Sequence, residues 1–196
     1  MRLYHRPGSR STRVLWTLEE IGAPYELTII SREDKASEAH RRRHPLGRVP
    51  VLELDDGQHV FESAAICLHL GDLYPESGLV PPVGTAERAL TYQWSLFAMA
   101  EVEGSLLTLR RARRTGDDDS EPTAKFGQIA GVLREALGDG RPWLVGDAFT
   151  VADVLCGSLI GTAFRRDLLD EDGPLRDYAE RAQVRPANVR AEAIRE

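Results

Sequence analysis

The chain has 196 residues, of which 42% are hydrophobic and 29% charged, and its formal net charge is −6. These values are ordinary for a globular protein, and the length allows one large domain or two small ones. The negative charge gives no general attraction to nucleic acid, and no run approaches the roughly 20 apolar residues that a membrane span needs.

The cysteines and histidines give no sign of a disulfide framework or a metal site. The two cysteines, Cys67 and Cys156, lie far apart inside helical patterns, and the five histidines show no metal-ligand spacing. Such cysteine usage favours a reducing compartment, and the first residues carry no secretion signal. We therefore expect a cytoplasmic protein without a metal and without a nucleic-acid or membrane partner.

The first 30 residues predict a strand, a helix and a second strand. Residues 2–4 form a short strand that ends in a polar turn at 5–9. Apolar residues at helical spacing follow: Val14, Leu15, Leu18 and Ile21. Gly22 and Pro24 end this helix, and residues 25–30 are rich in strand formers. This order is a βαβ unit, which implies a parallel pair of strands.

A predicted hairpin follows a charged segment, residues 31–44, which reads as a loop with a short helix. Two short β-rich runs flank Asp56 and Gly57, a strong hairpin signal. The second run leads into a helix that reaches about residue 73. The resulting order, βαβ–α–ββα, is that of a thioredoxin-like domain, which we place at residues 1–74.

Two backbone features converge on this hairpin. Pro50 stands at the start of the first run, where a residue without an N–H fits, and Val49 before it is pushed to extended geometry. Glu62 and Ser63 stand at the N-terminus of the following helix. An exposed extended residue and a helix N-terminus together suit a small peptide that carries a carboxylate.

The second half of the chain predicts helices only. A cluster of proline and glycine at residues 75–84 reads as a linker to a helical domain at 85–196. Thr85 is the expected N-cap of a long helix in which Gly104 is the expected kink. Ser120 is the expected N-cap of the next helix, whose buried stripe is Phe126, Ile129, Leu133 and Leu137.

A second cap pattern begins an apolar helix at residues 151–164. Thr150 and Asp153 form a capping-box pattern, and Phe149 faces Val154 as a hydrophobic staple. These residues fix the start of the helix and predict a role in folding rather than catalysis. Two short amphipathic segments follow.

The hairpin motifs resemble the glutathione-binding site of the cytosolic glutathione transferases, in a serine-type, bacterial-like form. In that family a Val-Pro with a cis bond precedes the third strand, and the valine backbone pairs with the cysteinyl unit of glutathione. A Glu/Gln-Ser pair then holds the γ-glutamyl end. Val49-Pro50 and Glu62-Ser63 match both motifs, and the capping box resembles that of the family's helical domain.

The resemblance implies an α+β N-terminal thioredoxin-like domain followed by an all-α C-terminal helical domain. It also implies a homodimer, glutathione as co-substrate and an electrophilic small molecule as second substrate. The implied reaction transfers an alkyl or aryl group by attack of the thiolate on an electrophilic carbon, as in detoxification. The alternatives are another glutathione-dependent enzyme (an isomerase, a dehalogenase or a disulfide reductase) or a non-catalytic interaction module.

The family uses a hydroxyl near the end of the first strand to hold the glutathione sulfur as a thiolate. The candidates are Ser9, Ser11 and Thr12 at the start of the first helix. Ser9 is our first choice because it directly follows a Pro-Gly turn, and Ser11 is the second; alternatively, either serine only caps the helix. Tyr4 is another hydroxyl but lies inside the strand. No cysteine stands here, which disfavours omega-type thiol exchange.

The remaining expected contacts hold the ends of glutathione. Ser63 is expected both to cap its helix and to receive the γ-glutamyl carboxylate, and Glu62 is expected at the same end. Arg48 and Lys35 are candidates for the glycine carboxylate; the alternative for each is an ordinary exposed loop charge.

Overall fold

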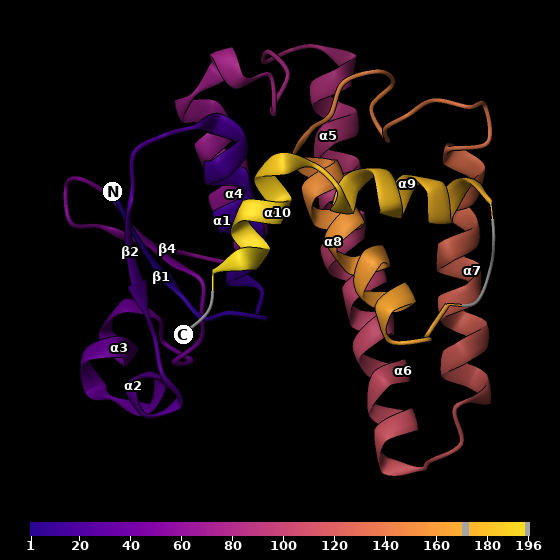
Figure 1. Cartoon of the computed structure of the whole chain (residues 1–196), viewed down its shortest axis with the longest axis horizontal. Helices are drawn as coiled ribbons and strands as arrows, with labels where there is room; N and C mark the ends of the chain where they lie inside the picture. Colours follow the sequence, from indigo (N-terminus) through magenta and orange to yellow (C-terminus); the bar gives the residue numbers. More distant parts are fainter. Residues whose placement is uncertain (170–172, 195–196) are drawn as a thin grey trace. The chain divides into compact units, whose positions relative to one another are not determined.

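The computed structural model describes residues 1–169 and 173–194, which form two compact units (Figure 1). The first unit consists of Met1–Ser77 and the described residues from Arg185 onwards, and the second is Gly78–Val184. The sequence predicts one helical domain at 85–196, whereas the contacts place its last helix with the first unit. Residues 170–172 and 195–196 of that predicted domain lie outside the described residues.

The first unit is built on a four-stranded mixed sheet in the order β2-β1-β3-β4. Its strands are β1 (Arg2–His5), β2 (Glu26–Ile29), β3 (Val51–Glu53) and β4 (His59–Phe61). Strand β1 runs parallel to β2 and antiparallel to β3, and β3 runs antiparallel to β4. This topology confirms the predicted thioredoxin-like fold.

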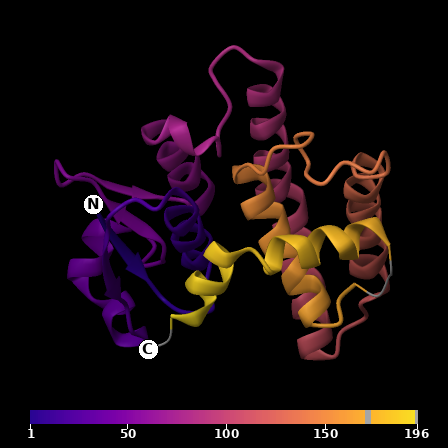
Figure 2. The same cartoon turned by 45° about the horizontal axis from the view of Figure 1, so that its top comes forward.

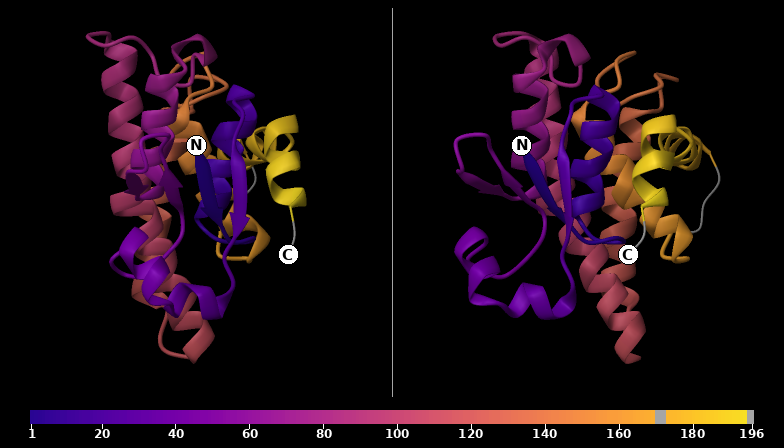
Figure 3. Two further views of the ribbon diagram at one scale, coloured as in Figure 1. Left: turned by 90° about the vertical axis from the view of Figure 1, so that its left-hand side faces the viewer. Right: turned by 60° about the vertical axis from the view of Figure 1, so that its left-hand side comes forward.

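Two helices of the first unit contact the sheet, and a third packs on one of them. Helix α1 (Ser11–Ile21) packs against β1 and against α4 (Ser63–Leu73), which in turn contacts β4 and the short η1 (Pro75–Ser77). Helix α10 (Pro186–Ala193) lies along α1 (Figure 3). A helix from the far end of the sequence therefore completes the packing of the first one.

The charged segment after β2 contains two short helices rather than one. They are α2 (Arg32–Ala36) and α3 (Glu38–Arg43). Ser31 caps α2 by accepting the Asp34 N–H, and Ser37 caps α3 by accepting the His40 N–H. Because each serine satisfies a free N–H of the first turn, the segment divides into two capped helices.

Carboxylates of α1 anchor α10. The Arg185 guanidinium makes two bonds to Glu20, with Nε 2.6 Å from Oε1 and the terminal nitrogen 2.7 Å from Oε2. Glu20 also accepts the indole N–H of Trp16 at 2.8 Å, and Arg190 binds Glu19 at 2.6 Å. The Glu20 side chain is only 11% exposed, so the bonds that Glu20 makes are weakly screened by solvent.

We expect Glu20→Ala to lower the free energy of unfolding by about 1–3 kcal/mol, because the indole and guanidinium donors lose a largely buried charged acceptor. Urea unfolding at pH 7 measures the change. Glu38→Ala is the matched control: Glu38 pairs with Arg42 on α3 but is 88% exposed, and such a pair contributes little. Equal losses in the two variants would contradict this anchoring role.

The second unit is helical. Its helices are α5 (Ala86–Phe97), η2 (Ala98–Val102), α6 (Glu103–Thr115), α7 (Ser120–Ala136), α8 (Val151–Arg165) and α9 (Pro174–Gln183). The apolar α8 contacts α5, η2, α6 and α9 and is the central helix (Figure 2). In the described part of the chain, no helix has the length and apolar character to cross a membrane.

Two of the predicted helix signals in this unit are wrong in detail. Thr85 does cap α5 by accepting the Arg88 N–H, but the long helix is interrupted by the π-helical turn η2 rather than by Gly104, which lies inside α6. Ser120 is the first residue of α7, whose N-cap is Asp119. The predicted capping box of Thr150 and Asp153 is confirmed at the start of α8.

Candidate functional site

The register of the sheet brings the hairpin motifs and the first turn to one end. Tyr4 of β1 pairs with Val51 of β3, which pairs with Phe61 of β4. The end of β1, the beginning of β3 and the end of β4 therefore coincide. The turn that carries Ser9 follows β1, Val49-Pro50 precedes β3 and Glu62-Ser63 follows β4. All three segments therefore lie at this end of the sheet.

The segment before β3 presents an open backbone. The Val49-Pro50 bond is cis, as the resemblance implies. Within the described residues, neither the N–H nor the C=O of Val49 has a hydrogen-bonding partner. The neighbouring Arg48 carbonyl is held by His40, whose Nε2 lies 2.9 Å away. An extended peptide can therefore pair with Val49 as an added strand.

Gly47 lets this segment approach α2 closely. Its φ is +59°, and a Cβ added there would lie 2.6 Å from the carbonyl oxygen of Lys35. No residue with a side chain fits this position without a shift of the backbone. The approach places Lys35 and Arg48 near the same end of the sheet, where neither side chain makes a hydrogen bond or ion pair with another described residue.

The start of α4 combines an unusual backbone with an unpaired hydroxyl. Glu62, the N-cap, has φ 74° and ψ 114°, a region that non-glycine residues rarely occupy and that is concentrated at functional sites. Ser63 is the first residue of α4 and is 2% exposed, and in the described structure its Oγ has no hydrogen-bonding partner. The prediction that Ser63 caps this helix is therefore wrong. A buried hydroxyl without a partner costs free energy, which a bound acceptor at the helix N-terminus would recover.

The first turn holds two serine hydroxyls in contact. Ser9 is partly exposed and Ser11 is fully buried. Their Oγ atoms lie 2.8 Å apart, and Ser9 Oγ donates to the Arg6 carbonyl at 2.7 Å. Ser11 Oγ accepts the Arg6 N–H at 3.0 Å. Only Ser9 of this pair is open to a ligand, whereas Ser11 is used within the turn.

His5, which is not among the site residues predicted from the sequence, contacts this pair from the buried side. Its Nδ1 is 2.8 Å from Ser11 Oγ, and the residue is completely buried. Burial lowers the pKa of His5 to about 4, so the ring is neutral at pH 7. Its position in the strand could have indicated its burial. Side chains two positions apart in a strand point to the same face, so His5 at the end of β1 shares the buried face of Leu3.

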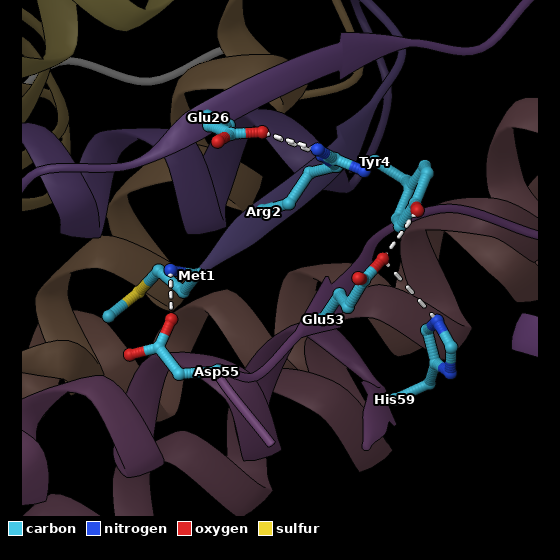
Figure 4. Close-up of polar contacts among 7 residues, drawn as sticks. All are labelled: Met1, Arg2, Tyr4, Glu26, Glu53, Asp55 and His59. Carbon is cyan, nitrogen blue, oxygen red and sulfur yellow. Dashed lines mark hydrogen bonds and ion pairs between the residues drawn. The ribbon is translucent and has the colours of Figure 1, made fainter. Parts of the chain in front are cut away.

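Tyr4 is excluded as the thiol-binding hydroxyl. It alternates with Leu3 and His5 and therefore points to the opposite face of the sheet. There it donates to Glu53 Oε2 at 2.5 Å, and this hydrogen bond holds the pKa of the Glu53 carboxyl below its usual range (Figure 4). Glu53 also lies 3.6 Å from His59 Nε2.

Known proteins resemble this chain in both sequence and fold. Residues 3–78 match the family model of the glutathione S-transferase N-terminal domain. The chain is 29% identical to glutathione S-transferase GstA of Escherichia coli O157:H7, over 84% of this chain and 83% of that protein. It is 33% identical to glutathione S-transferase hmp2 of Hypomyces subiculosus, over 74% of each.

This chain belongs to the glutathione S-transferase family. A sphingomonad glutathione S-transferase solved with glutathione has 26% sequence identity, with a TM-score of 0.81 over 98% of this chain and 97% of that chain. The predictions of family and fold are therefore confirmed. Every candidate site residue falls within residues 3–78, the segment that matches the transferase N-terminal domain.

The other reactive groups do not add to the candidate site. Cys67 is completely buried inside α4, and burial raises the pKa of its thiol to about 12, so it is inert as a nucleophile at pH 7. Among residues 1–169 and 173–194, no group of three or more His, Cys, Asp or Glu side chains is placed to hold a metal ion.

Proposed function

We propose that this chain is a glutathione S-transferase that binds glutathione along Val49 and holds its sulfur as a thiolate with Ser9. The observation that carries the proposal is the coincidence, at one end of one sheet, of two unpaired groups and one partly exposed serine. The unpaired groups are the Val49 backbone and the buried Ser63 hydroxyl, and the serine is Ser9, whose hydroxyl is hydrogen-bonded within its turn. They match the backbone, the carboxylate and the thiol of one small peptide.

Each end of glutathione has a charge-complementary group in this arrangement. The γ-glutamyl carboxylate lies at the N-terminus of α4, where Ser63 Oγ and the helix dipole favour an anion. Glu62 lies at the same end and is suited to the γ-glutamyl ammonium. The cysteinyl unit pairs with the Val49 backbone, and Arg48 or Lys35 meets the glycine carboxylate as a cation.

The chemistry requires an ionised thiol. A free thiol has a pKa of about 8.5, so only a small fraction is ionised at pH 7. A hydrogen bond from Ser9 to the sulfur lowers that pKa because it stabilises only the charged form. The thiol proton leaves to solvent, a sulfur lone pair forms the bond to the electrophilic carbon, and the leaving group departs with its bonding electrons.

The proposal includes an electrophilic small molecule as the second substrate, a cytoplasmic location and a homodimer. The homodimer rests on the family resemblance. Light scattering at micromolar concentration should give twice the mass of one chain, and a monomer mass would contradict the dimer.

The first test uses the unmodified protein. Calorimetric titration with glutathione and with S-methylglutathione measures binding, and the thiolate ultraviolet absorbance gives the pKa of the bound thiol. We expect both peptides to bind, the thiol pKa to fall below 8, and an activated aryl halide to be conjugated. Absence of binding at millimolar glutathione would instead favour an interaction module. Binding with an unshifted pKa would favour a different glutathione-dependent reaction.

A further inference from the structure

The hydrogen bonds that link Ser9 to His5 have a direction, which follows from the number of hydrogens that each group can donate. Ser9 Oγ, Ser11 Oγ and His5 Nδ1 form a chain with two contacts of 2.8 Å. Each hydroxyl has one hydrogen to donate and two lone pairs, and a neutral imidazole has one N–H. The placement of the imidazole hydrogen therefore decides which way the two hydroxyls point.

Burial selects the tautomer of His5. Its Nε2 is buried, and in the described structure it has no hydrogen-bonding partner. Hydrogen on Nε2 would bury an unpaired N–H, which folded proteins rarely contain, and would leave Nδ1 as an acceptor. Hydrogen on Nδ1 gives every N–H of the cluster an acceptor, because Nδ1–H then donates to Ser11 Oγ.

This tautomer fills the acceptor capacity of Ser11. Its oxygen accepts from His5 Nδ1–H and from the Arg6 N–H at 3.0 Å. Its own hydrogen then goes outward to Ser9 Oγ at 2.8 Å, which is closer than the Arg6 carbonyl at 3.2 Å. Ser9 Oγ accepts this bond and keeps its hydrogen for the Arg6 carbonyl at 2.7 Å or for a ligand. All the hydrogens point from His5 towards Ser9.

We propose that His5 is a positioning residue that orients the Ser11 and Ser9 hydroxyls so that Ser9 presents its O–H to the glutathione sulfur. The proposal rests on the proposed glutathione transferase function. Donation from Nδ1 to Ser11 polarises each hydroxyl in turn, and a chain polarised in one direction strengthens its last bond. The opposite tautomer would draw the Ser11 hydrogen back to His5 and favour donation from Ser9 to Ser11.

Two variants of His5 separate orientation from packing. The amide N–H of His5→Asn lies near the place of Nδ1–H and can donate to Ser11, whereas His5→Leu removes the donor. We expect the pKa of the bound glutathione thiol to rise by about 0.5–1 unit in His5→Leu and to stay near the wild-type value in His5→Asn. The affinity for S-methylglutathione, which has no thiol, should change less than about twofold in both.

Several outcomes would overturn the role of His5. One is an unchanged thiol pKa in His5→Leu while Ser9→Ala raises it, which leaves the proposed function intact. A second is a thiol pKa that rises in His5→Asn as much as in His5→Leu. A third is a loss of S-methylglutathione affinity in His5→Leu as large as the loss of glutathione affinity, which would indicate that His5 acts through packing alone. A wild-type protein that binds glutathione without lowering the thiol pKa contradicts the proposed function itself.

A measurement on the wild-type protein does not depend on the stability of any variant. Long-range nitrogen–proton NMR correlations report the tautomer of each histidine. We expect His5 to be neutral at pH 7 with its hydrogen on Nδ1. A hydrogen on Nε2 would overturn the proposal.

Discussion

Replacing Asp153 by alanine is expected to lower the free energy of unfolding by about 3–5 kcal/mol, because several buried donors lose their acceptor at once. Asp153 is completely buried at the third position of α8. One oxygen accepts the Leu144 N–H at 3.0 Å and the Tyr178 hydroxyl at 3.2 Å. The other accepts the Thr150 N–H at 2.9 Å and its hydroxyl at 3.1 Å.

The four donors explain why the loss is large. The carboxylate joins the irregular segment at Leu144, the first turn of α8 and the α9 residue Tyr178. Alanine would leave each donor buried without an acceptor, and each such donor costs about 1–3 kcal/mol before the structure relaxes. Urea unfolding measures the total. Asp139→Ala removes an exposed ion pair with Arg141 and should cost less than about 1 kcal/mol; equal losses would contradict this account.

The same carboxyl should make stability depend on pH. Burial raises the pKa of Asp153 to about 6, although its hydrogen bonds oppose the shift. Between about pH 4 and pH 6 the folded protein therefore binds a proton that the unfolded chain has released, so this group contributes less stability as pH rises. We expect the stability deficit of Asp153→Asn, relative to wild type, to be larger at pH 4.5 than at pH 7. A larger deficit at pH 7 would show that the hydrogen bonds outweigh burial.

Replacing Ser9 by alanine is expected to raise the pKa of the bound glutathione thiol by about 1–2 units, since a hydrogen bond to a charged group contributes about 1.5–3 kcal/mol. At pH 6.5 the value of kcat/KM should fall about 10- to 100-fold in consequence, because less of the thiol is ionised. Above the raised pKa the thiol ionises in the variant also, so the difference from wild type should shrink. Thiolate absorbance and a pH profile of kcat/KM measure the two effects.

Two neighbouring hydroxyls provide the comparison for this prediction. Thr12 is 9% exposed and should leave the thiol pKa near its wild-type value when replaced by alanine. Ser11→Ala should lower stability, because it removes the acceptor of the Arg6 N–H in a buried position. It should also raise the thiol pKa by less than Ser9→Ala does, because it interrupts the chain from His5 but leaves the Ser9 donor. A thiol pKa that rises in Thr12→Ala and not in Ser9→Ala would assign the hydroxyl to Thr12.

The local features that the sequence predicts correctly are those determined by neighbouring residues. A proline at the start of a strand restricts Val49, and the capping box of α8 needs only Thr150 and Asp153 at the right spacing. These preferences act within a few residues of one another. Such local preferences can therefore be predicted without knowledge of the packing. The contact between Asp153 and Tyr178 cannot be predicted in this way, because it depends on the placement of α9.

The features that the sequence does not reveal depend on burial and on distant contacts. The Pro-Gly turn favours Ser9 over Ser11 but leaves both open as candidates, and the packed turn shows that Ser9 is partly exposed and Ser11 buried. His5 becomes informative only when its Nε2 is known to be buried without a partner among the described residues. The π-helical turn at Ala98–Val102 replaces the kink expected at Gly104, because helical propensity alone does not determine where a long helix is interrupted.

The position of α10 on α1 has a consequence for synthesis on the ribosome. The first unit consists of residues from both sides of Gly78–Val184, so its N-terminal part is translated well before the helix that covers it. During translation of Gly78–Val184, Glu19 and Glu20 of α1 have already been synthesised, whereas their partners Arg190 and Arg185 have not. The first unit can therefore reach its final packing only after translation has passed the second.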